Sequence, residues 1–193
     1  MSRTIRIAIA ALLTAALFAP ASPVAAAKAR HAAQVAKAAK ACPDADLDAT
    51  RARLSRIRKA ILCLHNEIRA QHGLKGLRQN NRLRKAAVGH SRDMVRHDYF
   101  EHTTPKGVTM LDRILRSRYV REDQGWELGE NLAWGTGAYG TPRGAIEAWM
   151  ESPGHRENIL RGAYRDVGIG VVVGVPGSKG LGATYTLDFG VRR

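Results

Sequence analysis

Residues 141–160 read TPRGAIEAWMESPGHRENIL, and they contain the most clearly bounded helix in the chain. Thr141 is a preferred N-cap residue and Pro142 suits the first helical position, so we predict that a helix begins here. The run Ser-Pro-Gly at 152–154 ends it. Apolar side chains at helical spacing predict its buried face, namely Ile146, Trp149 and Met150. This helix therefore packs on a core that other segments must supply.

Downstream of this helix the pattern changes from helix to strand. Residues 167–173 alternate glycine with valine and isoleucine, and residues 184–189 (TYTLDF) are β-branched and aromatic. The glycine-rich loop between them predicts a hairpin. Residues 128–134 are a further candidate strand.

Upstream, helical spacing returns. A first helix with one buried stripe is predicted from Leu54, Ile57, Ile61, Leu64 and Ile68. Two more helices are predicted over about residues 81–99 and 109–117. Several helices around a small, mostly antiparallel sheet give the fold class α+β.

Composition limits the protein class. The 193 residues are 45% hydrophobic, which is enough to bury one core and excludes a disordered chain. Two cysteines are too few for a disulfide-dense mini-protein or a four-thiolate zinc site.

The N-terminus resembles an export signal. Arg3 and Arg6 precede the apolar residues 7–19, and small residues for cleavage follow at Ala25–Ala27. The apolar run is shorter than the ~20 residues that a membrane span needs. We therefore predict a signal peptide over residues 1–27, a secreted, extracellular protein, and no transmembrane span after cleavage.

The next segment starts with an Ala/Lys-rich run that lacks large apolar side chains. This composition predicts a flexible or loosely helical linker over residues 28–45, followed by a domain over residues 46–193.

Export favours a disulfide between Cys42 and Cys63. If the first helix began at Leu47, Cys63 would lie ~24 Å along its axis, whereas five extended residues span only ~17 Å. The disulfide therefore requires the helix to begin later, near Thr50; otherwise the cysteines stay unpaired.

Positive charge gathers early in the chain. The formal net charge is +14, and a basic patch is predicted from Arg51, Arg53, Arg56, Arg58 and Lys59. Such a face binds anionic polymers, nucleic acid or an anionic envelope, or it is simply a solvated helix face. The lack of interleaved aromatic residues favours the solvated face.

One glycine motif is discarded. Residues 135–140 match G-x-G-x-x-G by letter, but they precede a helix cap and no parallel βαβ unit follows. No dinucleotide site is predicted.

Four segments point together to a known family. They are HDYFEH at 97–102, GENLA at 129–133, WMESPGHRENIL at 149–160 and DFG at 188–190. This ordered series resembles the bacterial branch of the CAP superfamily. Its SCP domain is shared by cysteine-rich secretory proteins, antigen five and plant pathogenesis-related proteins. The resemblance covers roughly residues 62–191.

The resemblance implies an α–β–α sandwich with a surface cleft of histidines and glutamates. The cleft histidines fall on His102 and His155, and the first glutamate falls on Glu130. Ser152 stands at the usual place of the second glutamate. Glu151 and Glu147 are tentative substitutes, but they lie about 150° and 110° from the buried direction, so we expect both to face solvent.

Two imidazoles and a carboxylate suit zinc or another divalent metal. The first hypothesis is therefore a non-catalytic extracellular or envelope binding module whose cleft is able to hold such an ion. The second is a zinc-dependent hydrolase that uses His102, His155 and Glu130. The third is an anionic-polymer binder that uses the basic first helix. The catalytic residues and the ligand are not identified by the sequence.

Overall fold

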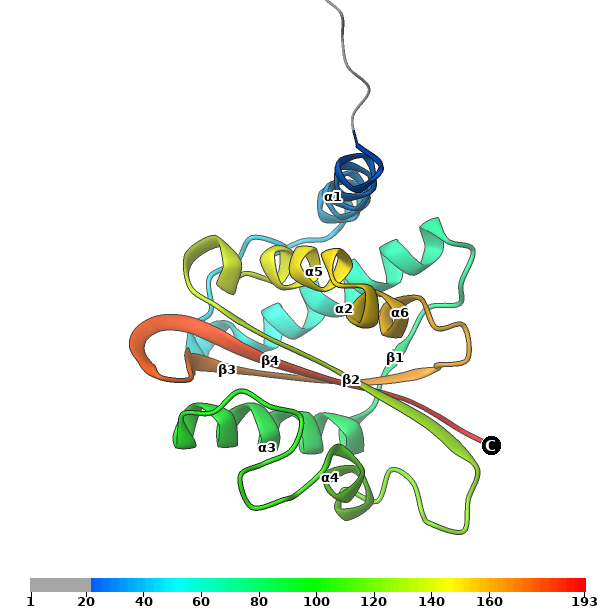
Figure 1. Cartoon of the computed structure of the whole chain (residues 1–193), viewed down its shortest axis with the longest axis vertical. Coiled ribbons are helices and arrows are strands. Elements are labelled where there is room, and N and C mark those ends of the chain that lie inside the picture. Colours follow the sequence, from blue (N-terminus) through cyan, green and yellow to red (C-terminus); the bar gives the residue numbers. More distant parts are fainter. Residues whose placement is uncertain (1–21) are drawn as a thin grey trace, which may run out of the picture.

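The computed structural model describes residues 22–193, with only the backbone at position 179. Figure 1 shows three layers, with one sheet between two sets of helices. The layer above the sheet in that view holds α1, α2, α5 and α6, and the layer below holds α3 and α4. The predicted α+β class and α–β–α sandwich are confirmed. Residues 1–21 of the predicted signal peptide lie outside the described residues.

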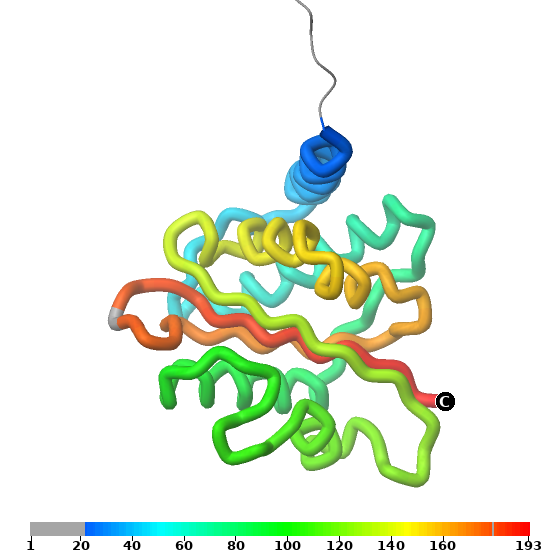
Figure 2. The backbone as a smooth tube through the Cα atoms, in the orientation of Figure 1, coloured from blue at the N-terminus to red at the C-terminus, as the bar shows by residue number. Residues whose placement is uncertain are grey.

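The sheet has four strands in the order β1-β3-β4-β2. The long strand β4 is antiparallel to both β2 and β3, and Figure 2 follows these three strands across the molecule. The predicted hairpin and all three predicted strands are present. The parallel strand β1 was not predicted, because two residues are too short to show a pattern. The bounds are β1 Arg78–Gln79, β2 Trp126–Gly135, β3 Asp166–Val175 and β4 Ser178–Arg192.

The upper layer is built on two predicted helices. In α2 (Leu54–Gln71), the predicted stripe is buried from Ile57 to Ile68. In α5 (Pro142–Glu151), the Thr141 hydroxyl accepts a hydrogen bond from the backbone N–H of Gly144, as its N-cap role requires. A bend at Ser152 ends α5, and α6 (Pro153–Leu160) follows at once. A short 3-10 turn, η2 (Gly137–Gly140), leads into α5.

The lower layer is formed by α3 (Asn81–His97) and α4 (Met110–Arg116). Two glycines of β3 allow α3 to lie directly on the sheet. A Cβ atom at Gly168 would lie 2.1 Å from the Leu83 carbonyl carbon, and one at Gly170 would lie 2.4 Å from that of Ala87. Helix and strand therefore meet backbone to backbone.

The predicted linker needs correction. Residues Pro23–Ala41 form a helix, α1, which packs against α2 and α5. Alanine is the strongest helix former, and the small residues allow close contact with the domain. Val35, Ala38 and Ala39 are buried there. The first half of α1 projects away from the body of the molecule (Figure 1).

The disulfide between Cys42 and Cys63 is present, with the two Cα atoms 5.7 Å apart. The condition on reach is also met, because a 3-10 turn, η1 (Arg51–Arg53), precedes α2 and the chain is extended at Thr50. The helices of residues 22–193 include none that is both long and apolar enough to cross a membrane.

Candidate functional site

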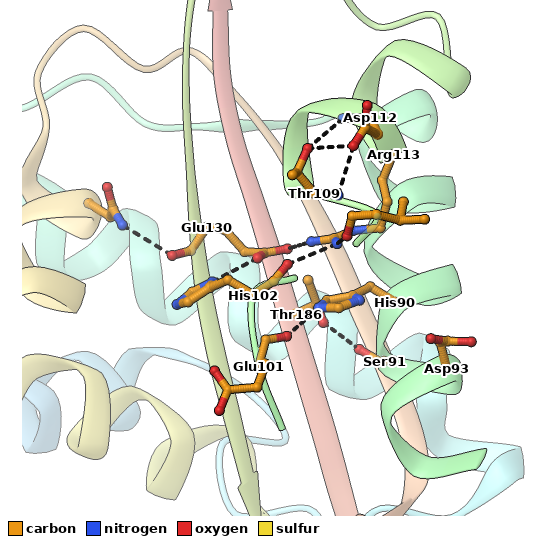
Figure 3. A network of polar contacts seen from close by, with 12 residues as sticks. His90, Ser91, Asp93, Glu101, His102, Thr109, Asp112, Arg113, Glu130 and Thr186 are labelled. Carbon is orange, nitrogen blue, oxygen red and sulfur yellow. Dashed lines mark hydrogen bonds and ion pairs between the residues drawn. The ribbon is translucent and has the colours of Figure 1, made fainter. Parts of the chain in front are cut away.

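The candidate site lies between β2 and the lower helices. Glu130 is on β2, Arg113 is on α4, and His102 is in the loop that joins α3 to α4. Figure 3 shows the side chains of His102 and Arg113 converging on the Glu130 carboxylate. The position of Glu130 on β2 is opposite Asp188 of β4.

Both oxygens of the Glu130 carboxylate are occupied. His102 Nδ1 donates a hydrogen bond of 2.8 Å to Oε1, and Arg113 Nη2 donates one of 2.6 Å to Oε2. The side chains of Glu130 and Arg113 are 2% and 8% exposed, whereas that of His102 is 57% exposed. The site therefore consists of a buried ion pair between Glu130 and Arg113, and Glu130 also binds the imidazole of His102 at the surface.

Arg113 also fixes the loop that carries His102. Its Nη1 donates to the backbone carbonyl of His102 at 2.9 Å and to that of Val108 at 3.3 Å. One buried guanidinium thus binds both the loop backbone and the site carboxylate. The sequence did not indicate Arg113, because nothing local distinguishes it from the rest of the 31 lysines and arginines.

Glu130 and His102 each shift the pKa of the other toward the charged form. The hydrogen bond to Glu130 raises the pKa of His102 above its ordinary value, although burial opposes it. Burial alone would raise the pKa of Glu130, but the His102 hydrogen bond and the Arg113 charge outweigh it, so that pKa is lowered. Glu130 is therefore ionised, and His102 gains protons more readily than a free histidine.

Two asparagines place His155 near this group. Asn131 Nδ2 donates to the backbone carbonyl of His155 at 3.0 Å. Asn158 Nδ2 donates to the Glu130 carbonyl at 3.2 Å and to Asn131 Oδ1 at 2.9 Å. These bonds attach α6 to β2. Burial lowers the pKa of His155, and the charge of His102 lowers it further, so the two imidazoles lie within electrostatic range.

The two tentative glutamates lie elsewhere. Glu151 is exposed and forms an ion pair of 3.5 Å with Lys28 of α1, and Glu147 is half-buried on α5. Within residues 22–193, neither makes a hydrogen bond or ion pair with the His102 group. No three His, Cys, Asp or Glu side chains in the described part of the chain are grouped so that they could hold a metal ion.

Asp188 belongs to the DFG motif but was not predicted as a site residue. It is fully buried, and its two carboxylate oxygens have no hydrogen-bond partner among the described residues. Burial raises its pKa well above the ordinary value, and the neighbouring Glu130 charge raises it further. Both effects favour the protonated form of Asp188 over the carboxylate. The alternation of TYTLDF, which places Asp188 on the face opposite Phe189, was the available signal.

His90 of α3 is a core histidine. It is buried, its Nε2 donates to the Glu101 carbonyl at 2.9 Å, and burial lowers its pKa. Beside it, Ser91 Oγ donates to Thr186 Oγ1 at 2.8 Å (Figure 3). These contacts join α3 to the sheet beneath the site.

The predicted basic patch is not uniform. Arg56 forms a bidentate ion pair with Asp44, and Arg58 is half-buried, where burial lowers its pKa. Arg51, Arg53 and Lys59 are exposed and have no ion-pair partner within 4 Å in residues 22–193. Three of the five predicted cations are therefore available to a partner.

Two relatives from Bacillus subtilis (strain 168) are similar in sequence. The uncharacterized membrane protein YlbC is 38% identical over 113 residues, and the uncharacterized protein YkwD is 34% identical over 119 residues. These matches cover 58% and 62% of this chain, which spans only 31% and 44% of the relatives' lengths.

Two solved structures share the fold. An extracellular protein with an SCP domain from Bacillus anthracis is 28% identical, with a TM-score of 0.56 over 72% of this chain and 44% of that one. An outer surface protein from Borrelia burgdorferi is 21% identical, with a TM-score of 0.58 over 75% of this chain and 96% of that one. The family model of the cysteine-rich secretory proteins matches residues 62–189. With well over half of its length so matched, and with this sandwich fold, the chain belongs to the cysteine-rich secretory protein (CAP) family.

Proposed function

We propose that the chain is a non-catalytic extracellular or cell-envelope binding module, in which His102 contacts a polar or anionic group of the ligand. The observation that carries the proposal is that each oxygen of the buried Glu130 carboxylate already accepts a hydrogen bond from an N–H donor. Glu130 therefore serves to orient His102 and to pair with the charge of Arg113.

The imidazole is well prepared for such a contact. Because Nδ1 is held by Glu130, Nε2 is the ring nitrogen left for a ligand, and it has no hydrogen-bond partner within residues 22–193. The raised pKa favours a protonated ring, which donates to carboxylate, phosphate or carbonyl oxygens. His155 is a second imidazole whose pKa is influenced by the charge of His102.

The donor set does not fit the predicted zinc site. A metal ion bound to an oxygen of Glu130 would compete with the hydrogen bond from His102 or Arg113, and the described residues contain no group of three ligands that could hold it. Displacing Arg113 would leave a buried guanidinium without its counter-charge, which costs roughly 3–5 kcal/mol. The geometry therefore supports the binding module over the zinc-dependent hydrolase.

Three observations support a location outside the cytoplasm. The chain contains a disulfide, which persists in oxidising compartments. The first residues have the pattern of a signal peptide. Finally, the similar structures are by name an extracellular protein and an outer surface protein.

The test is a titration of the mature protein with acetate and phosphate, followed by NMR of the histidine side chains. We expect saturable shifts of the His102 ring signals, lost in His102→Ala and kept in His72→Ala, which removes an exposed histidine at the end of α2. Calorimetry with zinc is the opposing measurement. Stoichiometric zinc uptake that needs both His102 and His155, together with zinc-dependent turnover lost in both variants, would overturn the proposal in favour of the hydrolase.

A further inference from the structure

A hollow lies in the lower layer, and neither His102 nor His155 lines it. It has a volume of about 630 Å³ and is enclosed by α3, α4 and the loop at residues 104–108. Small-molecule sites in proteins have volumes of ~300–1,000 Å³. This hollow is therefore large enough for a ligand of its own.

The walls of this α3–α4 cavity are mainly apolar. They are lined by Ala86, Gly89, Pro105 and Val108. At the inner wall the cavity reaches Arg113, whose charge is already matched by Glu130. An apolar body is therefore the part of a ligand that these walls would exclude from water.

The rim of the cavity is positively charged. Lys85, Lys106 and Arg116 line it, are exposed, and have no ion-pair partner within 4 Å in the described chain. The lining includes one acid, Asp93, and this carboxylate is engaged by the Tyr99 hydroxyl at 2.6 Å and by the His97 ring at 3.0 Å. The rim therefore has three cations without an ion-pair partner in the described chain, and its one carboxylate already binds Tyr99 and His97.

Gly89 forms part of the wall at a position where helix stability disfavours it. It lies in the middle of α3, where glycine costs about 1 kcal/mol of helix stability relative to alanine. Packing does not require it, because nothing lies within 4 Å of a Cβ atom built there. This contrasts with Gly168 and Gly170, where a Cβ would strike α3. The missing side chain keeps the cavity open and lets a flat group approach the helix backbone.

We propose that the α3–α4 cavity binds a small amphipathic anion, which has an apolar body of one or two rings and a single acidic head group. The body would lie over Gly89 between Ala86 and Val108. The head group would meet the cations of the rim. This proposal goes beyond the function proposed above, because it uses neither His102 nor His155, although Arg113 lies between the two sites.

The probe for the test is 8-anilinonaphthalene-1-sulfonate, an aromatic monoanion that fluoresces in apolar surroundings. Its uncharged relative N-phenyl-1-naphthylamine is the control for charge. With the mature protein we expect one saturable site for the anion and at least fivefold weaker binding of the neutral compound. Equal binding of the two compounds would overturn the proposal.

Variants locate the site. Gly89→Leu fills the cavity and should abolish fluorescence, whereas Gly89→Ala should keep most of it. Lys106→Gln and Arg116→Gln should each weaken binding about two- to fivefold, as expected for an exposed charge pair. Lys59→Gln removes an exposed cation of α2, in the opposite layer, and should change nothing.

Circular dichroism shows whether Gly89→Leu folds. If it does not, the charge variants and the NMR shifts of the Gly89 and Val108 amides test whether the anion binds in this cavity. Shifts at these amides on adding the anion support the site. An unshifted pair of amides, or a Lys59→Gln variant weakened as much as Lys106→Gln, would reject it.

Discussion

Glu130 and Arg113 show how one buried charge depends on another. In Glu130→Gln, Arg113 keeps its charge at 8% exposure but loses its carboxylate partner. We expect a destabilisation of about 3–5 kcal/mol, measured by urea unfolding. The pKa of His102 should fall at the same time, because the hydrogen bond that raises it is lost. NMR titration of the ring measures this second effect.

Glu151→Gln is the matched control for this change. Glu151 is exposed, and its ion pair with Lys28 lies at the surface, where such pairs contribute ~0–1 kcal/mol. An equal loss of stability in both variants would show that the buried pair of Glu130 and Arg113 contributes no more than the exposed pair of Glu151 and Lys28.

Asp188 predicts a dependence of stability on pH. Its pKa is raised in the folded protein, so its contribution to stability is complete below the ordinary pKa of about 4 and is lost as pH rises toward the folded pKa. Asp188→Asn removes the ionisable group, and with it the loss of stability at rising pH. The stability difference between variant and wild type should grow by up to about 1.4 kcal/mol per pH unit from pH ~4 until the folded pKa is reached. Unfolding curves at pH 4 to 8 measure it.

A difference that stays constant across this pH range would mean that Asp188 ionises normally in the folded chain. Glu130 works in the opposite direction: its pKa is lowered, so its contribution is present above the ordinary pKa and lost as pH falls through the folded one. Comparison with Glu130→Gln separates the two carboxyls.

The site was only partly predictable at the level of residues. The family pattern indicated His102, Glu130 and His155, and the structure joins the first two directly. Arg113 could not be predicted, because its role depends on a contact between α4 and β2 that no local pattern reveals. The alternation in TYTLDF could indicate Asp188, but not the influence of Glu130 on its pKa, which arises from the register of two strands.

At the level of elements, the two glycines of β3 predict a strong steric effect. Gly168→Ala would place a methyl group against the α3 backbone, 2.1 Å from a Leu83 atom. Overpacking of this kind costs ~1–3 kcal/mol, and more where backbone must move. We expect at least that loss in thermal unfolding. Gly89→Ala is the control, and it should stabilise the protein because its Cβ enters open space.

The disulfide joins the end of α1 to the middle of α2. Replacing both Cys42 and Cys63 by serine opens a loop with a sequence separation of 21 residues. Loop entropy predicts a loss of about 3 kcal/mol, measured as a lower urea midpoint than that of the oxidised wild type. Reduction of the wild type should reproduce it. An unchanged midpoint would mean that packing alone holds α1.

Strong local signals explain which elements could be predicted. The helix at 142–151 carries its own cap, first-turn proline and apolar stripe, and the structure has the same bounds. By contrast, the sequence of α1 predicts only a flexible or loosely helical linker, because its alanines show no apolar stripe on their own. They become a packed face only when α2 and α5 lie against them. The predicted alternative of a loosely helical segment is thus realised as a helix that tertiary contacts hold against the domain.

For the whole molecule, the net charge of +14 predicts attraction to polyanions. Binding to a phosphate polymer should weaken steeply with salt. The triple variant Arg51→Gln, Arg53→Gln, Lys59→Gln should reduce the slope of log affinity against log salt by about 2–3 if these exposed cations make the contacts. Arg56→Gln is the control, since Arg56 is paired with Asp44. Salt-independent binding would contradict this expectation.

The bond between Cys42 and Cys63 also has a mechanical consequence. A pulling force applied at Ser22 would unwind α1 as far as Cys42, and the load would then pass through the sulfur atoms into α2. Residues 43–62 would bear no tension. Under a reducing agent the same pull would release them, which adds about 70 Å of extensible chain. In a single-molecule experiment, this oxidation-dependent step would separate the unwinding of α1 from the rupture of the sandwich.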